Sequence, residues 1–213
     1  MIPPTQSDVR KALAADLSTE QHVWLTAALR SVQQNPPGID RFFAAARRRC
    51  GRSVLTAAPE NLADWTRDDA ARALLLHALP PHREAVGDAV ARLYRSGDAA
   101  ERRAVLRALP LLDIADAAVP LVQDALRTND SRLITVAMGP YAQAHLDQSS
   151  WRQGVLKCLF VGIPLTSVFG LAERVDTELV RMATAFAEER TAAGRTVPPD
   201  VDAVLSAGIG PLS

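Results

Sequence analysis

The sequence predicts an all-α protein, and three observations support this prediction. Apolar residues recur with helical periodicity in one segment after another, whereas the alternation typical of strands is almost absent. Alanine, leucine and arginine, which are strong helix formers, fill these segments. Prolines and glycines stand between them, where helices are expected to end. We therefore expect antiparallel helix pairs, arranged either as a HEAT-like solenoid or as an irregular helical bundle.

The first helices are predicted over residues 7–15, 18–33 and 39–50. The second ends before Asn35-Pro36-Pro37-Gly38, because two successive prolines cannot continue a helix. Further along, Thr66 and Asp69 have the spacing of a capping box, so a helix is expected from there to about Leu79. The next helices are expected over residues 82–95, 99–109 and 114–127, with Asp98 as the N-cap of the middle one.

One short sequence repeat indicates that helix pairs recur along the chain. The sequence LLHALP at residues 75–80 returns as VLRALP at residues 105–110, which is 30 residues later. HEAT repeats are typically about 40–47 residues long, but two helices joined by tight turns fit a shorter period. The alternative is a helical bundle in which both endings reuse a good helix stop. The short repeat leaves both arrangements open.

The segment from Trp151 to Val161 predicts a buried helix with a lysine in its middle. Ser149 or Ser150 is expected to cap it, and Gly162 is expected to end it. Its residues are apolar around nearly the whole circumference, which is typical of a buried helix. Lys157 is unusual in this setting, because Lys11 is the only other lysine among 24 basic residues.

Three roles for Lys157 are open. Its stem can lie along apolar surface while the ammonium meets water or a structural carboxylate, which is the role that we favour. It can be a fixed cation that binds an anionic ligand. Finally, a desolvated amine that loses its proton could act as a base or form a Schiff base. Among the functional roles, we prefer the anion-binding cation.

A further helix is expected after Asp176, which is its predicted N-cap, and it should end at Gly194. Its apolar stripe has the spacing of one helix face and comprises Leu179, Met182, Ala183, Phe186 and Ala187. Three arginines flank this helix: Arg174, Arg190 and Arg195. They could converge with Lys157 on a carboxylate or phosphate, or they could pair with neighbouring glutamates, which is the interpretation that we favour.

The C-terminal part resembles the EboA family, which is named after a bacterial gene cluster for secondary metabolism. The matching residues are Gly139-Pro140-Tyr141, Trp151, Gln153, Val155-Leu156-Lys157, Leu159-Phe160, Gly162, Pro164-Leu165, Gly170-Leu171, Arg174, Glu178-Leu179, Arg181-Met182, Ala187, Glu189-Arg190 and Ala192-Ala193-Gly194-Arg195. The likeness is strong over residues 139–200, loose over about 70–130 and weak before that. The length and the 48% of hydrophobic residues allow one extended domain or two small ones, and we expect one helical domain over residues 1–213. Within it we expect divergent helices in 1–60, hairpin repeats in 61–138, the family motif in 139–200 and a tail in 201–213.

The chain departs from the family pattern at three places. The pattern has an Asn–Gln pair after the aromatic residue, an Asn before Pro–Tyr, and Asp–Tyr in the last long helix. This chain has Arg152-Gln153, Gly139 and Ala185-Phe186 there. These departures remove hydrogen-bonding groups, so we expect a divergent member with an altered ligand or role.

Composition excludes several classes of partner. The chain has 24 basic and 24 acidic residues, so no overall charge favours nucleic acid, and the Arg47–Arg52 run is expected to be a solvated helix end. Two cysteines cannot form a disulfide framework, and neither a leader nor a membrane-spanning segment is expected, which predicts a cytoplasmic protein. His77, His82 and Glu84 do not have metal-ligand spacing, and no metal or cofactor is expected.

Two functional hypotheses follow. The resemblance implies natural-product biosynthesis, and the first hypothesis is a non-catalytic helical protein that binds an anionic or prenyl-linked intermediate, or a partner enzyme. The second is an enzyme that acts on such an intermediate, with Lys157 as the candidate catalytic residue. We favour the first, because the sequence shows no paired nucleophile and base. The expected ligand-binding residues are Tyr141, Trp151, Gln153, Lys157, Arg174, Arg190 and Arg195.

Overall fold

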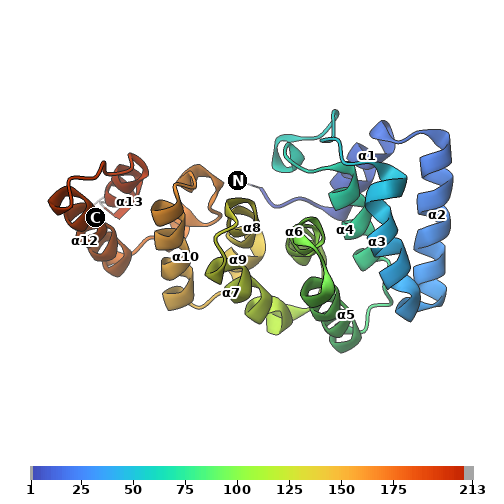
Figure 1. Cartoon of the computed structure of the whole chain (residues 1–213). Helices are drawn as coiled ribbons and strands as arrows, with labels where there is room; N and C mark the ends of the chain where they lie inside the picture. Colours follow the sequence, from blue (N-terminus) through green and yellow to red (C-terminus); the bar gives the residue numbers. More distant parts are fainter. Residues whose placement is uncertain (1, 209–213) are drawn as a thin grey trace. The chain divides into compact units, whose positions relative to one another are not determined.

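The computed structural model describes residues 2–208 and confirms that the protein is all-α (Figure 1). No strand is found in this part of the chain, where Val54 and Thr66 form an isolated antiparallel bridge. The α-helices are α1 (Gln6–Asp16), α2 (Thr19–Gln34), α3 (Ile39–Cys50), α4 (Arg67–His77), α5 (Arg83–Ser96), α6 (Ala99–Ala108), α7 (Val119–Arg127), α8 (Ser131–Ala137), α9 (Pro140–His145), α10 (Gln148–Val161), α11 (Leu171–Arg174), α12 (Thr177–Ala192) and α13 (Asp200–Gly208). Short 3₁₀ helices span Pro36–Gly38, Glu60–Leu62, Leu109–Leu111, Ala115–Ala118 and Leu165–Ser167.

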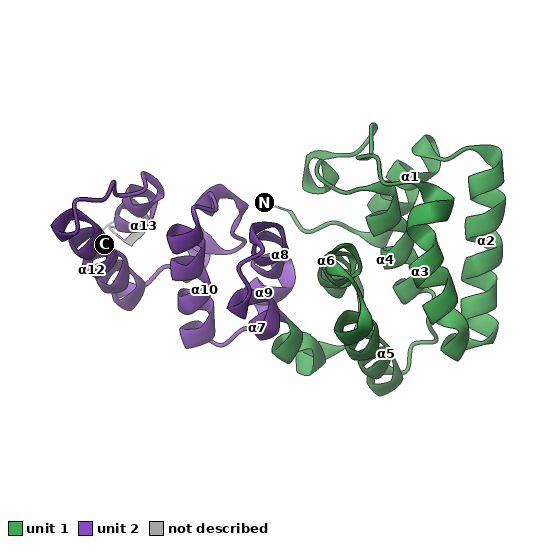
Figure 2. Cartoon of the chain, in the orientation of Figure 1, with its two compact units in different colours: residues 1–121 green, residues 122–213 purple. Residues whose placement is uncertain are grey.

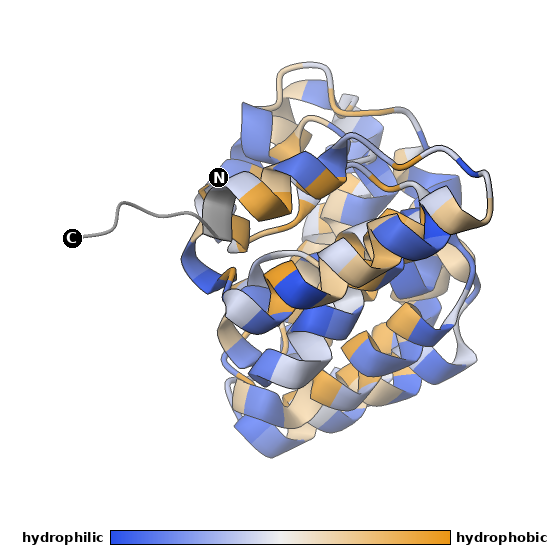
Figure 3. Ribbon diagram, turned by 90° about the vertical axis from the view of Figure 1, so that its left-hand side faces the viewer, coloured by the Kyte–Doolittle hydropathy of each residue, from blue (hydrophilic) through white to orange (hydrophobic). Residues whose placement is uncertain are grey.

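The chain forms two compact units, and the boundary between them lies within α7 (Figure 2). Unit 1 comprises residues 1–121 and unit 2 comprises residues 122–213. Hydrophilic and hydrophobic positions alternate along the helical ribbons, as expected of helices that bury one face (Figure 3). None of the helices that the structure describes has the length and apolar character needed to cross a bilayer. The organisation of residues 1–213 as a single domain stays a prediction.

Several predicted helix ends are confirmed by their hydrogen bonds. Thr66 and Asp69 form the expected capping box at α4, and Asp98 forms another with Glu101 at α6. Asp176 caps α12 by accepting a hydrogen bond from the backbone N–H of Leu179 at 2.9 Å. Gly162 ends α10 with a φ of 80°, a left-handed conformation that glycine adopts without strain.

Other predicted boundaries are wrong. The helix expected over residues 114–127 is divided, because Pro120 lacks an N–H and occupies the first turn of a new helix that follows a 3₁₀ turn. The N-cap of α10 is Asp147 rather than Ser149 or Ser150, since its carboxylate accepts from the Ser150 N–H at 2.8 Å. Within the expected tail over 201–213, the residues up to 208 belong to α13, while residues 209–213 lie outside the described residues.

Unit 1 is built around α4, which is buried on all sides. Every residue from Asp68 to Leu76 is buried, and α4 packs against α1, α3 and α6. Two carboxylates lie within this core, and Asp69 is fully buried. Because a buried charge is costly without a partner, each of them must be compensated by a neighbouring cation.

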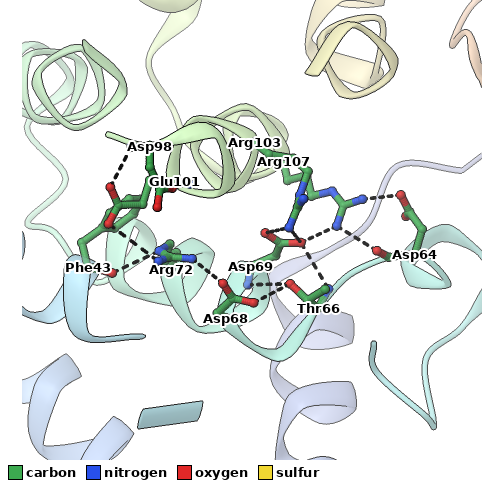
Figure 4. A network of polar contacts seen from close by, with 10 residues as sticks. All are labelled: Phe43, Asp64, Thr66, Asp68, Asp69, Arg72, Asp98, Glu101, Arg103 and Arg107. Atoms are coloured by element: carbon green, nitrogen blue, oxygen red, sulfur yellow. Dashed lines mark hydrogen bonds and ion pairs between the residues drawn. The ribbon is translucent and has the colours of Figure 1, made fainter. Parts of the chain in front are cut away.

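Arginines from α4 and α6 provide this compensation (Figure 4). Asp69 accepts a hydrogen bond from Arg107 Nη1 at 2.5 Å, and Arg103 Nη2 lies 3.2 Å from the same carboxylate. Asp68 accepts from Arg72 Nη1 at 2.6 Å, and Arg72 Nε donates to the carbonyl oxygen of Phe43 at 3.0 Å. The network therefore joins α3, α4 and α6. These contacts neutralise the buried carboxylates and stabilise the core of unit 1.

Unit 2 is organised around α10. Trp151, Val155, Cys158 and Leu159 form its buried face. Gly154 allows close packing, because a Cβ at this position would overlap the Met138 side chain at the end of α8. The opposite side of α10 is less covered, and this is where the candidate site lies.

Candidate functional site

A wide groove of about 810 Å³ lies in unit 2 between α7, α10 and α12. Its apolar lining comprises Leu126, Gly154, Leu156, Phe160, Met182, Ala185 and Phe186. Its polar and charged lining comprises Gln123, Arg127, Ser149, Ser150, Gln153, Lys157, Arg181 and Glu189. Small-molecule sites commonly have volumes of about 300–1,000 Å³ and a mainly apolar lining with a few polar groups. The volume of the groove lies within that range, and apolar atoms make up most of its exposed surface although about half of the lining residues are polar or charged.

The helical spacing of α10 creates one wall of the groove. Gln153, Leu156, Lys157 and Phe160 lie at the i, i+3, i+4 and i+7 positions of one face. Phe160 is 68% exposed, which is unusual for a phenylalanine within an apolar helix. The expectation that α10 is buried around its circumference is therefore wrong. Its apolar residues serve two surfaces, a buried one that faces the core of unit 2 and an open one that faces the groove.

Lys157 lies on the open face and is only partly buried. Its Nζ donates a hydrogen bond to Asn129 Oδ1 at 3.0 Å. Among residues 2–208, no carboxylate forms an ion pair with this ammonium group. Lys157 thus brings a positive charge to the groove without a neutralising partner.

The two arginines of the lining are both paired. Arg127 Nη2 lies 3.0 Å from Asp124 Oδ1. Arg181 binds Glu178 through two hydrogen bonds, of 2.8 and 2.7 Å. This pairing lowers the pKa of the Glu178 carboxyl, chiefly through the side-chain hydrogen bond from Arg181. Lys157 therefore differs from the other cations of the groove.

Only two of the predicted ligand-binding residues, Gln153 and Lys157, line the groove. Tyr141 is buried and its ring stacks on His145 at 4.3 Å. Trp151 is fully buried, and the Arg174 guanidinium lies 4.9 Å from its ring centroid. These aromatic side chains belong to the buried packing of unit 2 and do not line the groove.

Arg174 is engaged with the backbone around α9. Its Nη1 donates to the carbonyl oxygens of Ala142 and Gln143 at 3.1 and 2.9 Å, and its Nη2 donates to that of Leu146 at 2.9 Å. It also contacts Gln148 Oε1 at 3.0 Å. Because five donors in a planar fork match several acceptors at once, one arginine satisfies the end of this short helix. Arg174 is not among the residues that line the groove.

Arg190 and Arg195 lie at the C-terminal end of α12, outside the groove lining. Arg190 Nε donates to the Thr196 carbonyl oxygen at 2.6 Å, and its guanidinium lies over the ring of Phe186 at 5.6 Å. Arg195 is exposed. Among the described residues, these arginines do not converge with Lys157, which is the alternative that the sequence leaves open. The favoured ion pairs with neighbouring glutamates are not found in this part of the chain either, because Arg174 and Arg190 donate to backbone carbonyl oxygens instead.

Met182 and Phe186 line the groove, although the sequence pattern places them on a buried helix face. They stand on the apolar stripe of α12, which predicts burial in the core. Leu179 and Ala183 are indeed buried, but Met182 and Phe186 are half-buried and line the groove. A helix stripe indicates which residues avoid water on average, but it does not distinguish a core from an open apolar groove.

The cysteines of the described residues are buried and lie outside the groove lining. Burial raises the pKa of Cys158 to about 12, so its thiol is inert at neutral pH. The lining of the groove contains neither histidine nor cysteine. Within residues 2–208, no group of three or more His, Cys, Asp and Glu side chains is arranged to hold a metal ion.

Together, the fold and the groove define an all-α protein with a ligand-sized, mostly apolar surface groove. The chain belongs to the EboA family: a family model described as metabolite traffic protein EboA matches residues 5–206. The match extends over nearly the whole chain, including the N-terminal part in which the resemblance is weak. Comparisons with curated proteins and with solved structures gave no match.

The groove contains one of the departures from the family pattern. Ala185 and Phe186 stand where the pattern has Asp–Tyr, and both line the groove wall on α12. A second departure, Arg152, binds the α12 cap Asp176 through a hydrogen bond of 2.5 Å instead of facing the groove.

Proposed function

We propose that this protein is a non-catalytic accessory protein of a bacterial natural-product pathway, and that it binds a small intermediate of that pathway in the groove of unit 2. The groove itself carries the proposal. Apolar side chains from α10 and α12 line it, and Phe160 remains largely exposed to water. Covering these side chains with an apolar ligand would be favourable, by about 25 cal/mol for each Å² removed from water.

The family supports a role in handling a metabolite, because its model is described as metabolite traffic. A small molecule fits better than a partner enzyme, since the groove is concave and has the volume of a small-ligand site. Binding without chemistry suits a protein that carries, holds or delivers an intermediate. A cytoplasmic location, expected from the sequence, remains part of this proposal.

A substitution that fills the groove tests the proposal. Ala185 is exposed and lines the groove, so Ala185→Trp would place an indole in the ligand space without disturbing the core. Ala172→Trp is the matched control, because Ala172 is equally exposed but lies on α11 outside the lining. Binding of the neutral dye Nile red can be followed by its fluorescence.

We expect the wild-type protein and the Ala172→Trp variant to bind Nile red with the same affinity. The Ala185→Trp variant should bind at least about tenfold more weakly, which corresponds to a loss of about 1.4 kcal/mol. Circular dichroism would check that both variants keep their helix content. Equal binding by all three proteins would show that the groove is not the site, and no binding by the wild-type protein would contradict the proposal directly.

A further inference from the structure

We infer that the ligand is an amphiphile whose head group carries a single negative charge, and that Lys157 binds this head group. This inference rests on the proposed function and adds the chemical class of the ligand. It depends on three features of the groove: the unused hydrogen-bond donors of Lys157, the number of lining cations without a carboxylate partner, and the apolar wall beside Lys157.

The first feature is that Lys157 has unused hydrogen-bonding capacity. An ammonium group has three N–H donors, and the structure assigns one of them to Asn129 Oδ1 at 3.0 Å. Asn129 is a neutral amide, so it orients the amine without neutralising its charge. The next residue, Asp130, accepts from the backbone N–H of Arg132 at 3.0 Å as the cap of α8. Its carboxylate is committed to that helix end.

The second feature is the number of available cations. Arg127 is paired with Asp124 and Arg181 is paired with Glu178, so Lys157 is the lining cation without a carboxylate partner among the described residues. Glu189 also lines the groove and adds a negative charge. Sites for phosphate or diphosphate usually gather several donors, such as bidentate arginines or helix N-termini. A lining with one unpaired ammonium group and one glutamate therefore favours a ligand head group with a single negative charge.

The apolar wall lies directly beside this cation. Leu156 is the neighbour of Lys157 on α10, and Phe160 lies less than one turn further along the same face. Met182 and Phe186 provide apolar surface from α12. A ligand that binds both features needs an anionic head and an apolar chain or ring system. A neutral hydrocarbon would leave the cation unpaired, and a small anion would leave the apolar wall in water.

Three ligands with the same chain test this inference by competition with Nile red, below their critical micelle concentrations. Decanoate carries one negative charge, decan-1-ol carries none, and decyl phosphate carries about 1.5 to 2 at neutral pH. The proteins are the wild type, Lys157→Met and Lys157→Arg. Glu189→Gln is the control for charge, because it removes a lining charge of the opposite sign.

We expect the wild-type protein to bind decanoate at least about tenfold more tightly than decan-1-ol, as a charge-assisted hydrogen bond should provide. Lys157→Met should lose this preference and keep the affinity for decan-1-ol, while Lys157→Arg should retain the preference. Decyl phosphate should bind no more tightly than decanoate, and Glu189→Gln should not weaken the binding of decanoate.

The outcomes separate this inference from the proposed function. If decanoate and decan-1-ol displace Nile red equally well, or if Lys157→Met leaves decanoate binding unchanged, the head-group inference is overturned while the groove remains a binding site. Much tighter binding of decyl phosphate would overturn the single-charge assignment. Failure of the wild-type protein to bind Nile red or any of the three ligands would overturn both.

Discussion

At the scale of single residues, Arg174 and Arg195 show how different two arginines of the same motif can be. Arg174 donates to three backbone carbonyl oxygens and to Gln148, and burial lowers the pKa of its guanidinium without removing its charge at neutral pH. Arg195 is exposed beyond the end of α12. Both match the family motif, but only the first holds elements of unit 2 together.

We predict that Arg174→Lys destabilises the protein by about 2 kcal/mol or more, because lysine cannot supply the planar fork and leaves part-buried carbonyl oxygens unpaired. Arg195→Lys is the matched control and should change the free energy of unfolding by less than about 0.5 kcal/mol. Urea denaturation followed by circular dichroism measures both. Equal stability of the two variants would mean that the Arg174 contacts contribute nothing.

Lys157 illustrates what the sequence can and cannot predict about one residue. Its rarity and its apolar neighbours indicate a special role, and the structure places it in the groove. Its partner Asn129 comes from the loop before α8, which is 28 residues away. No helical periodicity links a loop amide to a distant helix face, so this contact could not be inferred from spacing.

At the scale of elements, the start of α12 combines two functions in one carboxylate. Asp176 accepts from the Leu179 N–H as the helix cap and from Arg152 Nη2 at 2.5 Å. The side-chain hydrogen bond from Arg152 is the main reason that the pKa of the Asp176 carboxyl lies well below its usual range. The helix cap could be predicted from the residue type and position of Asp176. The ion pair between Arg152 and Asp176 could not, because it forms only when α10 packs against α12.

The lowered pKa of Asp176 predicts a dependence of stability on pH. The folded protein keeps this carboxylate charged at pH values where the unfolded chain already binds a proton, so its contribution is present above about pH 4 and is lost as the pH falls further. We expect Asp176→Asn to be less stable than wild type at pH 7, by about 1 kcal/mol, because the cap survives and the ion pair does not. The difference should shrink at pH 3.

Urea denaturation at pH 7 and at pH 3 measures this difference. Glu178→Gln is a suitable control, because the pair that it removes is exposed and should have little effect on stability. A difference between wild type and Asp176→Asn that stays constant from pH 7 to pH 3 would contradict the assigned role of the carboxylate.

At the scale of the whole molecule, different sets of contacts stabilise the two units. Unit 1 relies on the buried network around Asp69, and unit 2 relies on α10 with its arginine contacts. The all-α class and the order of the main helices could be predicted, because periodicity, caps and prolines act locally. The groove could not, since residues from α7, α10 and α12 meet only when unit 2 is folded.

We predict that Asp69→Asn destabilises unit 1 strongly, by about 3 kcal/mol or more, because Arg107 and Arg103 lose their buried carboxylate partner and Arg107 keeps only the exposed Asp64. Hydrogen exchange measured by mass spectrometry should show faster exchange in α4 and α6. Exchange in α10 and α12 should change less. Asp113→Asn is the control, since Asp113 forms an exposed pair with Arg83 in the same unit. Uniform acceleration across all helices would contradict the assignment of the network to unit 1.

The central claim, that the groove of unit 2 binds an apolar ligand, can be tested most directly with methionine methyl signals in NMR. The chain has three methionines: Met182 lines the groove, Met138 lies beneath it against Gly154, and Met1 is the first residue of the chain. Protein labelled with ¹³C at the methionine methyl groups would be titrated with decanoate, and Met182→Leu would assign the Met182 signal. We predict a saturable shift that is largest for Met182 and is abolished by Ala185→Trp. A Met182 signal that stays unchanged while decanoate binds would contradict this account.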